Sequence, residues 1–312
     1  MITKTEMEKL RGRLLFSDGD LHVYAGISKK EFPELYEEIR KISEREFNIE
    51  NAYDRFDETY KYLVCIAEYE RPGELPFEKV CEVVSFYRYI LCKDAFSQED
   101  ITFDLSTNKF YDYSFRFKMI LPATLELGRS VVNHNSQKAK DGLEAIWKGL
   151  GALIDYYSEK EKIKYLFGEV SLQKSRYDLT NIWENDSLMA IISCFIVNFY
   201  HDEIITPKEP MKGFSLPELV SFAKEKDFKG EAFSKDAHKL KDLLRTRSLP
   251  KPHLFFHYAS LMEENGMQMF LPVNNDLLNC WEVGLLLSIE RIKPEWLSHF
   301  TPKNYRKQAF LW

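Results

Sequence analysis

The spacing of apolar residues predicts one helix and two strands in the first third of the chain. Within 31–46 they recur every three or four positions, which is typical of an amphipathic helix. The apolar run 62–67 and the Val- and Tyr-rich run 79–92 both predict strands. Because the Arg-Pro-Gly-Glu sequence at 71–74 predicts a turn between them, we expect a β-hairpin.

The middle of the chain predicts a strand, a long helix, another strand and another helix. The strand covers 123–132, and Gly128 weakens its centre, so a β-bulge is expected there. The clearest helical spacing in the chain lies at 143–154. A strand at 165–172 and an apolar helix at 188–200 follow.

The last third of the chain begins with a polar segment and then returns to helix and strand patterns. Residues 206–250 are rich in proline and lysine, with helical fragments at 216–223 and 239–245, and they read as an insertion. Helical spacing resumes at 254–265, where Gly266 predicts the end of the helix. Apolar runs at 268–273 and 283–289 predict two closing strands.

These elements predict an α+β fold with a mixed, mostly antiparallel central sheet flanked by helices and carrying a helical insertion. Residues 1–205 form the core in this interpretation. Residues 206–250 form a helical, basic insertion, and residues 251–312 supply the closing helix and strands of the same domain.

Composition excludes several classes of protein. The 312 residues carry a formal net charge of −6, which argues against a binder of nucleic acid, because phosphate contacts require a basic surface. The start of the chain lacks the apolar core of a secretory signal, and no apolar run is long enough to span a membrane. We therefore expect a cytoplasmic protein, with peripheral contact at the inner face of the membrane as an open alternative.

Cysteine and histidine positions favour neither disulfides nor a metal site. The five cysteines are an odd number, widely spaced and set in apolar stretches, as expected of reduced thiols in a core. The seven histidines show no ligand spacing, and His253 with His257 lacks an acidic third partner. We expect no metal ion.

Several motifs carry a resemblance to a known family. They are Leu-Glu-Leu-Gly-Arg-Ser at 125–130, the helix at 143–154, Tyr-Leu-Phe-Gly at 165–168, Asp-Arg-Phe-Asp at 54–57 and the strand ending in Tyr-Arg at 82–88. Together they resemble the hemolysin-like or ornithine-lipid (amino-acid lipid) N-acyltransferase branch of the GNAT superfamily. The Glu-x-x-Arg element is also distantly similar to that of acyl-homoserine-lactone synthases.

The resemblance implies a GNAT-like sheet, an acyl thioester donor and a small amine acceptor, with no permanently bound cofactor. The donor that the resemblance implies is acyl-CoA or an acyl-phosphopantetheine on acyl carrier protein. Of the usual phosphate loop, the segment 137–142 keeps only Gln137 and Gly142, but Lys138 and Lys140 add positive charge at a helix start. A backbone N–H near Val131 or Val132 would stabilise the developing oxyanion.

Glu126 is the candidate general base, because an acceptor ammonium must lose a proton before it can attack. Arg129 would assist or hold an acceptor carboxylate. Residues i and i+3 of a regular strand point to opposite faces, so joint action of the two requires a bulge near Gly128. The alternative is a buried Glu126–Arg129 pair with a purely structural role.

Three further groups have competing interpretations. Asp54 and Asp57 would orient the acceptor amine or pair with Arg88, or else lie in a solvated loop. His134 lies beside the predicted phosphate loop or is plain surface. The basic residues of 239–251 would meet acyl carrier protein or an anionic bilayer, or form a solvated face. They are Lys239, Lys241, Arg245, Arg247 and Lys251.

The sequence thus predicts an N-acyltransferase that moves an acyl chain, expected to be long, from a thioester to the amine of an amino acid, by direct attack and in the context of aminolipid synthesis. Two alternatives stay open. One is a catalytically silent GNAT-fold protein that binds acyl thioesters, suggested by the reduced phosphate loop. The other is a short-chain acetyltransferase.

Overall fold

The computed structural model describes residues 4–70, 79–99, 102–174 and 183–310. Contacts divide the chain into two compact units. Unit 1 comprises residues 1–102, 123–164 and 294–312, and unit 2 comprises 103–122 and 165–293. The predicted turn at 71–74 lies outside the described residues.

An antiparallel sheet forms the centre of unit 1, with strand order β1-β2-β3-β4-β8. The predicted hairpin is confirmed as the β3–β4 pair. The β1–β2 hairpin was not predicted, although Asp18, Gly19 and Asp20 between two apolar runs are a typical turn signal. The strands are β1 (Leu14–Asp18), β2 (Leu21–Ile27), β3 (Lys61–Glu70), β4 (Lys79–Leu91) and β8 (Thr124–Val132).

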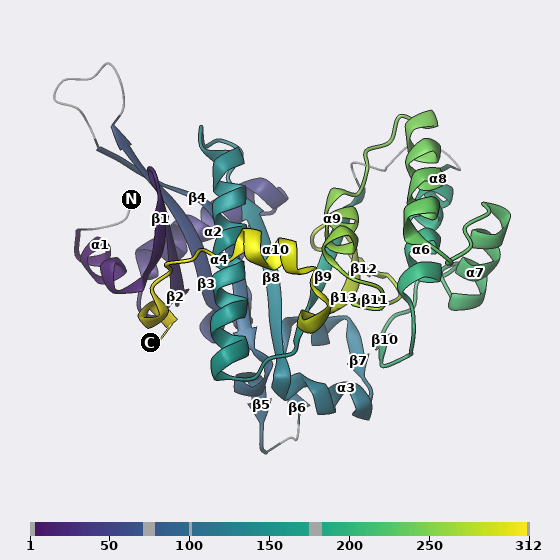
Figure 1. Cartoon of the computed structure of the whole chain (residues 1–312), viewed down its shortest axis with the longest axis horizontal. Helices are drawn as coiled ribbons and strands as arrows, with labels where there is room; N and C mark the ends of the chain where they lie inside the picture. Colours follow the sequence, from purple (N-terminus) through teal and green to yellow (C-terminus); the bar gives the residue numbers. More distant parts are fainter. Residues whose placement is uncertain (1–3, 71–78, 100–101, 175–182, 311–312) are drawn as a thin grey trace. The chain divides into compact units, whose positions relative to one another are not determined.

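Two helices cover the faces of this sheet. Helix α2 (Pro33–Phe47) buries its apolar stripe against Tyr62, Val64 and Phe86. Helix α4 (Ala139–Lys160) covers the opposite face, where Gly149 approaches Leu63, and it crosses in front of the strands in Figure 1. Tyr62 and Leu63 face different helices because strand side chains alternate. Both helices were predicted. Helix α2 begins and ends slightly later than the predicted range 31–46, and α4 extends beyond both ends of the predicted range 143–154.

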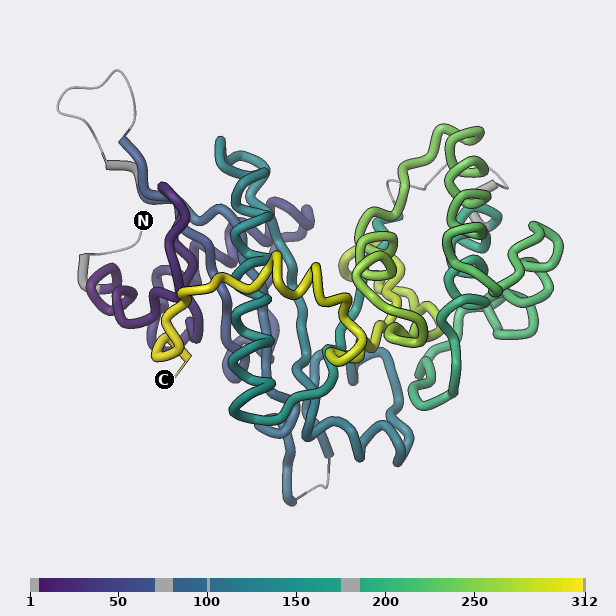
Figure 2. The backbone as a smooth tube through the Cα atoms, in the orientation of Figure 1, coloured from purple at the N-terminus to yellow at the C-terminus, as the bar shows by residue number. Residues whose placement is uncertain are grey.

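Short elements complete unit 1. The C-terminal segment returns to β1, where the Arg306 N–H donates to the Leu15 carbonyl at 2.8 Å, and Figure 2 shows this yellow segment beside the purple strand. The short helical elements are α1 (Lys4–Leu10), η1 (Arg11–Arg13), η2 (Arg55–Glu58), η3 (Cys92–Ala95), η5 (Leu121–Ala123), α10 (Pro294–Phe300) and η7 (Lys307–Phe310).

Unit 2 combines a smaller antiparallel sheet with a group of helices. Strand β13 pairs with β9 along its whole length and also with β11 and β12. Phe195 forms an aromatic core with Phe233, Phe255 and Phe256 of the neighbouring helices. The sheet strands are β9 (Tyr165–Gln173), β11 (Met267–Met269), β12 (Val273–Asn275) and β13 (Cys280–Ser288), and the helices are α6 (Trp183–Phe199), α7 (Leu216–Glu225), α8 (Phe233–Thr246) and α9 (His253–Leu261).

The remaining short elements are β5 (Phe96–Ser97), β6 (Thr102–Phe103), η4 (Ser106–Lys109), β7 (Tyr111–Tyr113), α3 (Phe115–Ile120), β10 (Ile205–Pro207) and η6 (Ile289–Arg291). The predicted end of the helix at Gly266 is wrong. Helix α9 ends at Leu261, because Met262 turns extended and bridges to Ile292. The fold class is confirmed: the chain is α+β, with mostly antiparallel strands flanked by helices.

Candidate active site

The Asp-x-x-Asp motif folds into a rigid turn at the start of η2. The Asp54 side chain caps the turn by accepting from the Phe56 N–H at 3.0 Å. The Asp57 carboxylate returns to accept from the Asp54 N–H, also at 3.0 Å. This reciprocal capping box holds both carboxylates in fixed positions.

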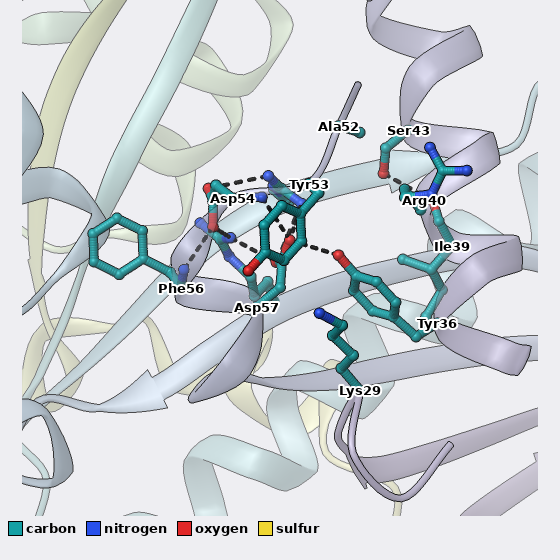
Figure 3. Close-up of polar contacts among 12 residues, drawn as sticks. Lys29, Tyr36, Ile39, Arg40, Ser43, Ala52, Tyr53, Asp54, Phe56 and Asp57 are labelled. Atoms are coloured by element: carbon teal, nitrogen blue, oxygen red, sulfur yellow. Dashed lines mark hydrogen bonds and ion pairs between the residues drawn. The ribbon is translucent and has the colours of Figure 1, made fainter. Parts of the chain in front are cut away.

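Asp57 is the centre of a buried polar cluster. It is fully buried, and its carboxylate accepts from the hydroxyls of Tyr36 at 2.7 Å and Tyr62 at 2.6 Å. Figure 3 shows the Tyr36 hydroxyl directed at Asp57, with Asp54 beside it. Burial alone would raise the pKa of Asp57, but the guanidinium groups of Arg129 and Arg88 outweigh it and hold the pKa below its ordinary value.

Both arginines bridge the two aspartates. Arg88 on β4 lies 2.8 Å from Asp54 and 2.9 Å from Asp57, and it is 3% exposed. Arg129 on β8 lies 3.0 Å from Asp54 and 3.1 Å from Asp57. The predicted pairing of the aspartates with Arg88 is therefore present, and the alternative of a solvated acidic loop is wrong.

A β-bulge brings Arg129 into this cluster. The pairing shifts from Phe86 opposite Val131 to Arg88 opposite Gly128, so one extra residue lies on β8. Arg129 takes up the irregularity with φ of 47°, in the left-handed region that side chains rarely adopt. The expected bulge near Gly128 is confirmed.

Glu126 lies at the inner end of the same cluster. It is fully buried on β8 and accepts a hydrogen bond from the Tyr60 hydroxyl. The Tyr60 ring lies 4.8 Å from the Arg88 guanidinium, which connects Glu126 to the aspartates. Arg129 makes its ion pairs with the aspartates and not with Glu126, so the alternative of a simple Glu126–Arg129 pair is wrong.

The three tyrosines are the members of the cluster that the sequence analysis missed. Tyr36 comes from α2, Tyr62 from β3 and Tyr60 from the turn that precedes β3. A buried tyrosine hydroxyl needs a hydrogen-bond partner. Tyrosines in a predicted strand or on an apolar helix face could therefore have indicated that buried polar partners lie nearby. The sequence does not identify their partners, because some of these lie far away along the chain; Tyr60 and Glu126, for example, are 66 positions apart.

The predicted donor residues surround the end of β8 and the start of α4. Val131 is buried, Val132 is half-buried, and Gln137 and Lys140 are exposed. Lys138 is half-buried and donates to Asp20 at 3.2 Å.

Gly142 has a packing role at this helix start. A Cβ there would collide with Val84, its carbonyl accepts from Ser85, and its N–H already donates to the Lys138 carbonyl. In the described part of the chain, the N–H groups of Lys140 and Asp141 have no acceptor, as is usual in a first helical turn.

The other candidate groups lie outside the cluster. His134 is exposed and lies 2.7 Å from Glu46, which fits a surface role. Three basic residues of 239–251 are paired locally: Lys239 with Asp227, Arg245 with Asp242 and Arg247 with Asp186. This neutralises much of the charge that the sequence offered for docking.

The buried thiols are poorly suited to nucleophilic chemistry, and the described residues offer no metal site. No disulfide links the cysteines; four are buried, and Cys81 is exposed. Burial raises the pKa of Cys65 to about 12 and that of Cys194 further, so neither forms a thiolate readily. Among the described residues, no group of three or more His, Cys, Asp or Glu side chains is arranged to hold a metal ion.

Residues 34–148 match the family model of the acetyltransferase (GNAT) domain. This segment is a GNAT domain. It runs from α2 into α4 and contains Asp54, Asp57, Arg88, Glu126 and Arg129. The predicted class of enzyme, a GNAT-type N-acyltransferase, is confirmed by this domain together with two curated relatives that are named as N-acyltransferases.

Two curated proteins resemble nearly the whole chain. The glycine N(alpha)-acyltransferase of Bacteroides thetaiotaomicron is 25% identical over 93% of this chain and 84% of its own length. The glycine N(alpha)-acyltransferase of Phocaeicola vulgatus is 26% identical over 93% of this chain and 87% of its own length. No solved structure matches the chain. The similarity therefore extends beyond the GNAT domain into unit 2.

In the described residues, no helix combines the length and the apolar character needed to cross a bilayer.

Proposed function

We propose that this GNAT enzyme transfers an acyl chain from a thioester to the amine of glycine or a similarly small amino acid. The main support is the similarity to two glycine N(alpha)-acyltransferases over 93% of the chain. The buried Asp–Arg cluster inside the GNAT domain supports it too, since it provides both a carboxylate for an ammonium and a guanidinium for a carboxylate.

The acceptor is proposed to bind at the Asp54–Arg129 edge of the cluster. These side chains are 19% and 17% exposed, whereas Asp57, Glu126 and Tyr60 are fully enclosed. The acceptor ammonium would approach Asp54, and its carboxylate would approach Arg129. A small acceptor suits an edge with so little exposed polar surface.

Glu126 is proposed as the base that receives the amine proton, passed inward through the Tyr60 hydroxyl. The neutral amine then attacks the thioester carbonyl, the C–S bond breaks and an amide forms. The second amine proton leaves with the departing thiolate, which becomes a thiol. No covalent enzyme intermediate is required.

The donor is proposed to lie along the end of β8 and the start of α4. The free N–H groups of Lys140 and Asp141, with the Lys140 ammonium group, suit a phosphate of coenzyme A or of phosphopantetheine. Lys138 would join them by exchanging its bond to Asp20 for the phosphate. Gln137 and a backbone N–H near Val131 or Val132 complete this proposed donor site. A long acyl chain and a role in aminolipid synthesis are part of the same proposal.

The test is product formation by the purified protein. It would be mixed with acetyl, octanoyl and palmitoyl thioesters of coenzyme A and of acyl carrier protein, each with glycine, serine or ornithine. Mass spectrometry should detect N-acylglycine from a long-chain donor. Product from the acetyl donor alone would support the short-chain alternative. Thioester binding without product in any combination would support the silent binding protein.

A further inference from the structure

Helix α3 is short but firmly held in unit 2. The Ser114 hydroxyl caps it by accepting from the Phe117 N–H at 3.2 Å. The Phe117 ring is fully buried and packs at 5.1 Å from the Tyr113 ring and 4.9 Å from the Phe167 ring. These contacts fix which side of the helix faces the protein.

The opposite side of α3 exposes two large apolar side chains. Phe115 is 78% exposed and Met119 is 65% exposed. At 3.6 residues per turn they lie about 40° apart around the helix, and their common direction is about 180° from Phe117. The exposure is therefore a consequence of how Phe117 is anchored.

Two cations flank the apolar pair. Arg116 and Lys118 lie about 80° to either side of the direction shared by Phe115 and Met119. Arg116 is 74% exposed and lies 3.3 Å from Asp202, while Lys118 has no acidic partner among the described residues. The helix itself contains no acidic residue.

We propose that α3 docks on an anionic lipid bilayer, with Phe115 and Met119 inserted at the interface. Apolar side chains beside an unpaired cation such as Lys118 suit such a surface, and each unpaired Lys or Arg near it strengthens binding about fivefold. A stable protein partner needs about 800 Å² on each side, far more than two side chains offer. A bilayer has no such minimum area.

The experiment measures binding of the full-length protein to vesicles of phosphatidylglycerol or of phosphatidylcholine by co-sedimentation. We expect binding to the anionic vesicles and little to the neutral ones. The double variant Phe115→Ser, Met119→Ser should bind at least about tenfold more weakly, and Lys118→Glu at least about fivefold more weakly. The control Leu277→Ser, at another exposed apolar position of unit 2, should bind like the unchanged protein.

Two results would overturn this inference: absence of binding to the anionic vesicles, or equal binding by the double variant. The inference would also be overturned if light scattering gave the double variant a different molar mass from the unchanged protein. The patch would then be a contact between copies of the chain. Circular dichroism checks that the double variant is folded. Its acyl transfer in vesicle-free buffer should be unchanged, so the membrane inference and the proposed function can fail separately.

Discussion

Replacing Asp57 by Asn tests how the buried cluster is held together. The side chain keeps its shape, but the cluster loses one of the two carboxylates that neutralise Arg88 and Arg129. Because Arg88 is 3% exposed, water cannot compensate for the missing charge. Breaking a buried ion pair by removing one partner costs about 3 to 5 kcal/mol, so we expect a loss of this size in the free energy of unfolding at pH 7.

The effect should depend on pH with a definite sign. The pKa of Asp57 is lower in the folded protein than the value of about 3.9 expected in the unfolded chain. Its contribution to stability is therefore complete above about pH 4 and is lost as the pH falls through the lower, folded-state pKa. The difference in the free energy of unfolding between the unchanged protein and Asp57→Asn should therefore become smaller as the pH falls below about 4.

Urea unfolding followed by circular dichroism and by tryptophan fluorescence measures both effects. Asp94→Asn is the matched control, because Asp94 is exposed in the same unit, and its cost should stay within about 0.5 kcal/mol. If Asp57→Asn costs no more than this control at pH 7, the cluster does not have the electrostatic role described here.

Three further predictions concern the acceptor edge and the helix start. Arg129→Lys keeps the charge but loses the planar fork that reaches both aspartates, so it should raise the KM for glycine about tenfold; an unchanged KM would remove Arg129 from the acceptor site. Gly142→Ala should lower the free energy of unfolding by about 1 to 3 kcal/mol, because the added methyl group meets Val84. Gly12→Ala should not lower it, because the space around Gly12 is open, and similar urea midpoints for the two variants would contradict this prediction. Lys140→Ala should raise the KM for the thioester donor several-fold and leave the KM for glycine unchanged, as measured by steady-state kinetics; a reversed pattern would displace the donor site.

Local sequence patterns predicted most of the elements that carry the cluster. The β3–β4 hairpin, the long helix α4 and the bulge near Gly128 followed from periodicity and from a glycine in mid-strand. The bulge mattered most, because regular alternation would have placed Glu126 and Arg129 on opposite faces. Pairing of the acidic motif with Arg88 was also among the predicted alternatives.

What the sequence left undetermined depends on contacts between distant segments. The hydroxyls that complete the cluster come from Tyr36, Tyr60 and Tyr62, and no local pattern connects them to carboxylates on other elements. The end of α9 was misplaced for the same reason, since its last residue is followed by a bridge from Met262 to a segment 30 positions away. The basic segment 239–251 had indicated a docking surface, but ion pairs with acidic residues neutralise three of its basic side chains.

The most direct test of the account is the rate of N-acylglycine formation by the unchanged protein and by Glu126→Gln under saturating long-chain thioester. We predict that the unchanged protein forms the product and that the amide variant, folded by circular dichroism, forms it at least about 100-fold more slowly. Equal rates for the two proteins, or no product from the unchanged protein with any thioester, would contradict the role assigned to this buried carboxylate.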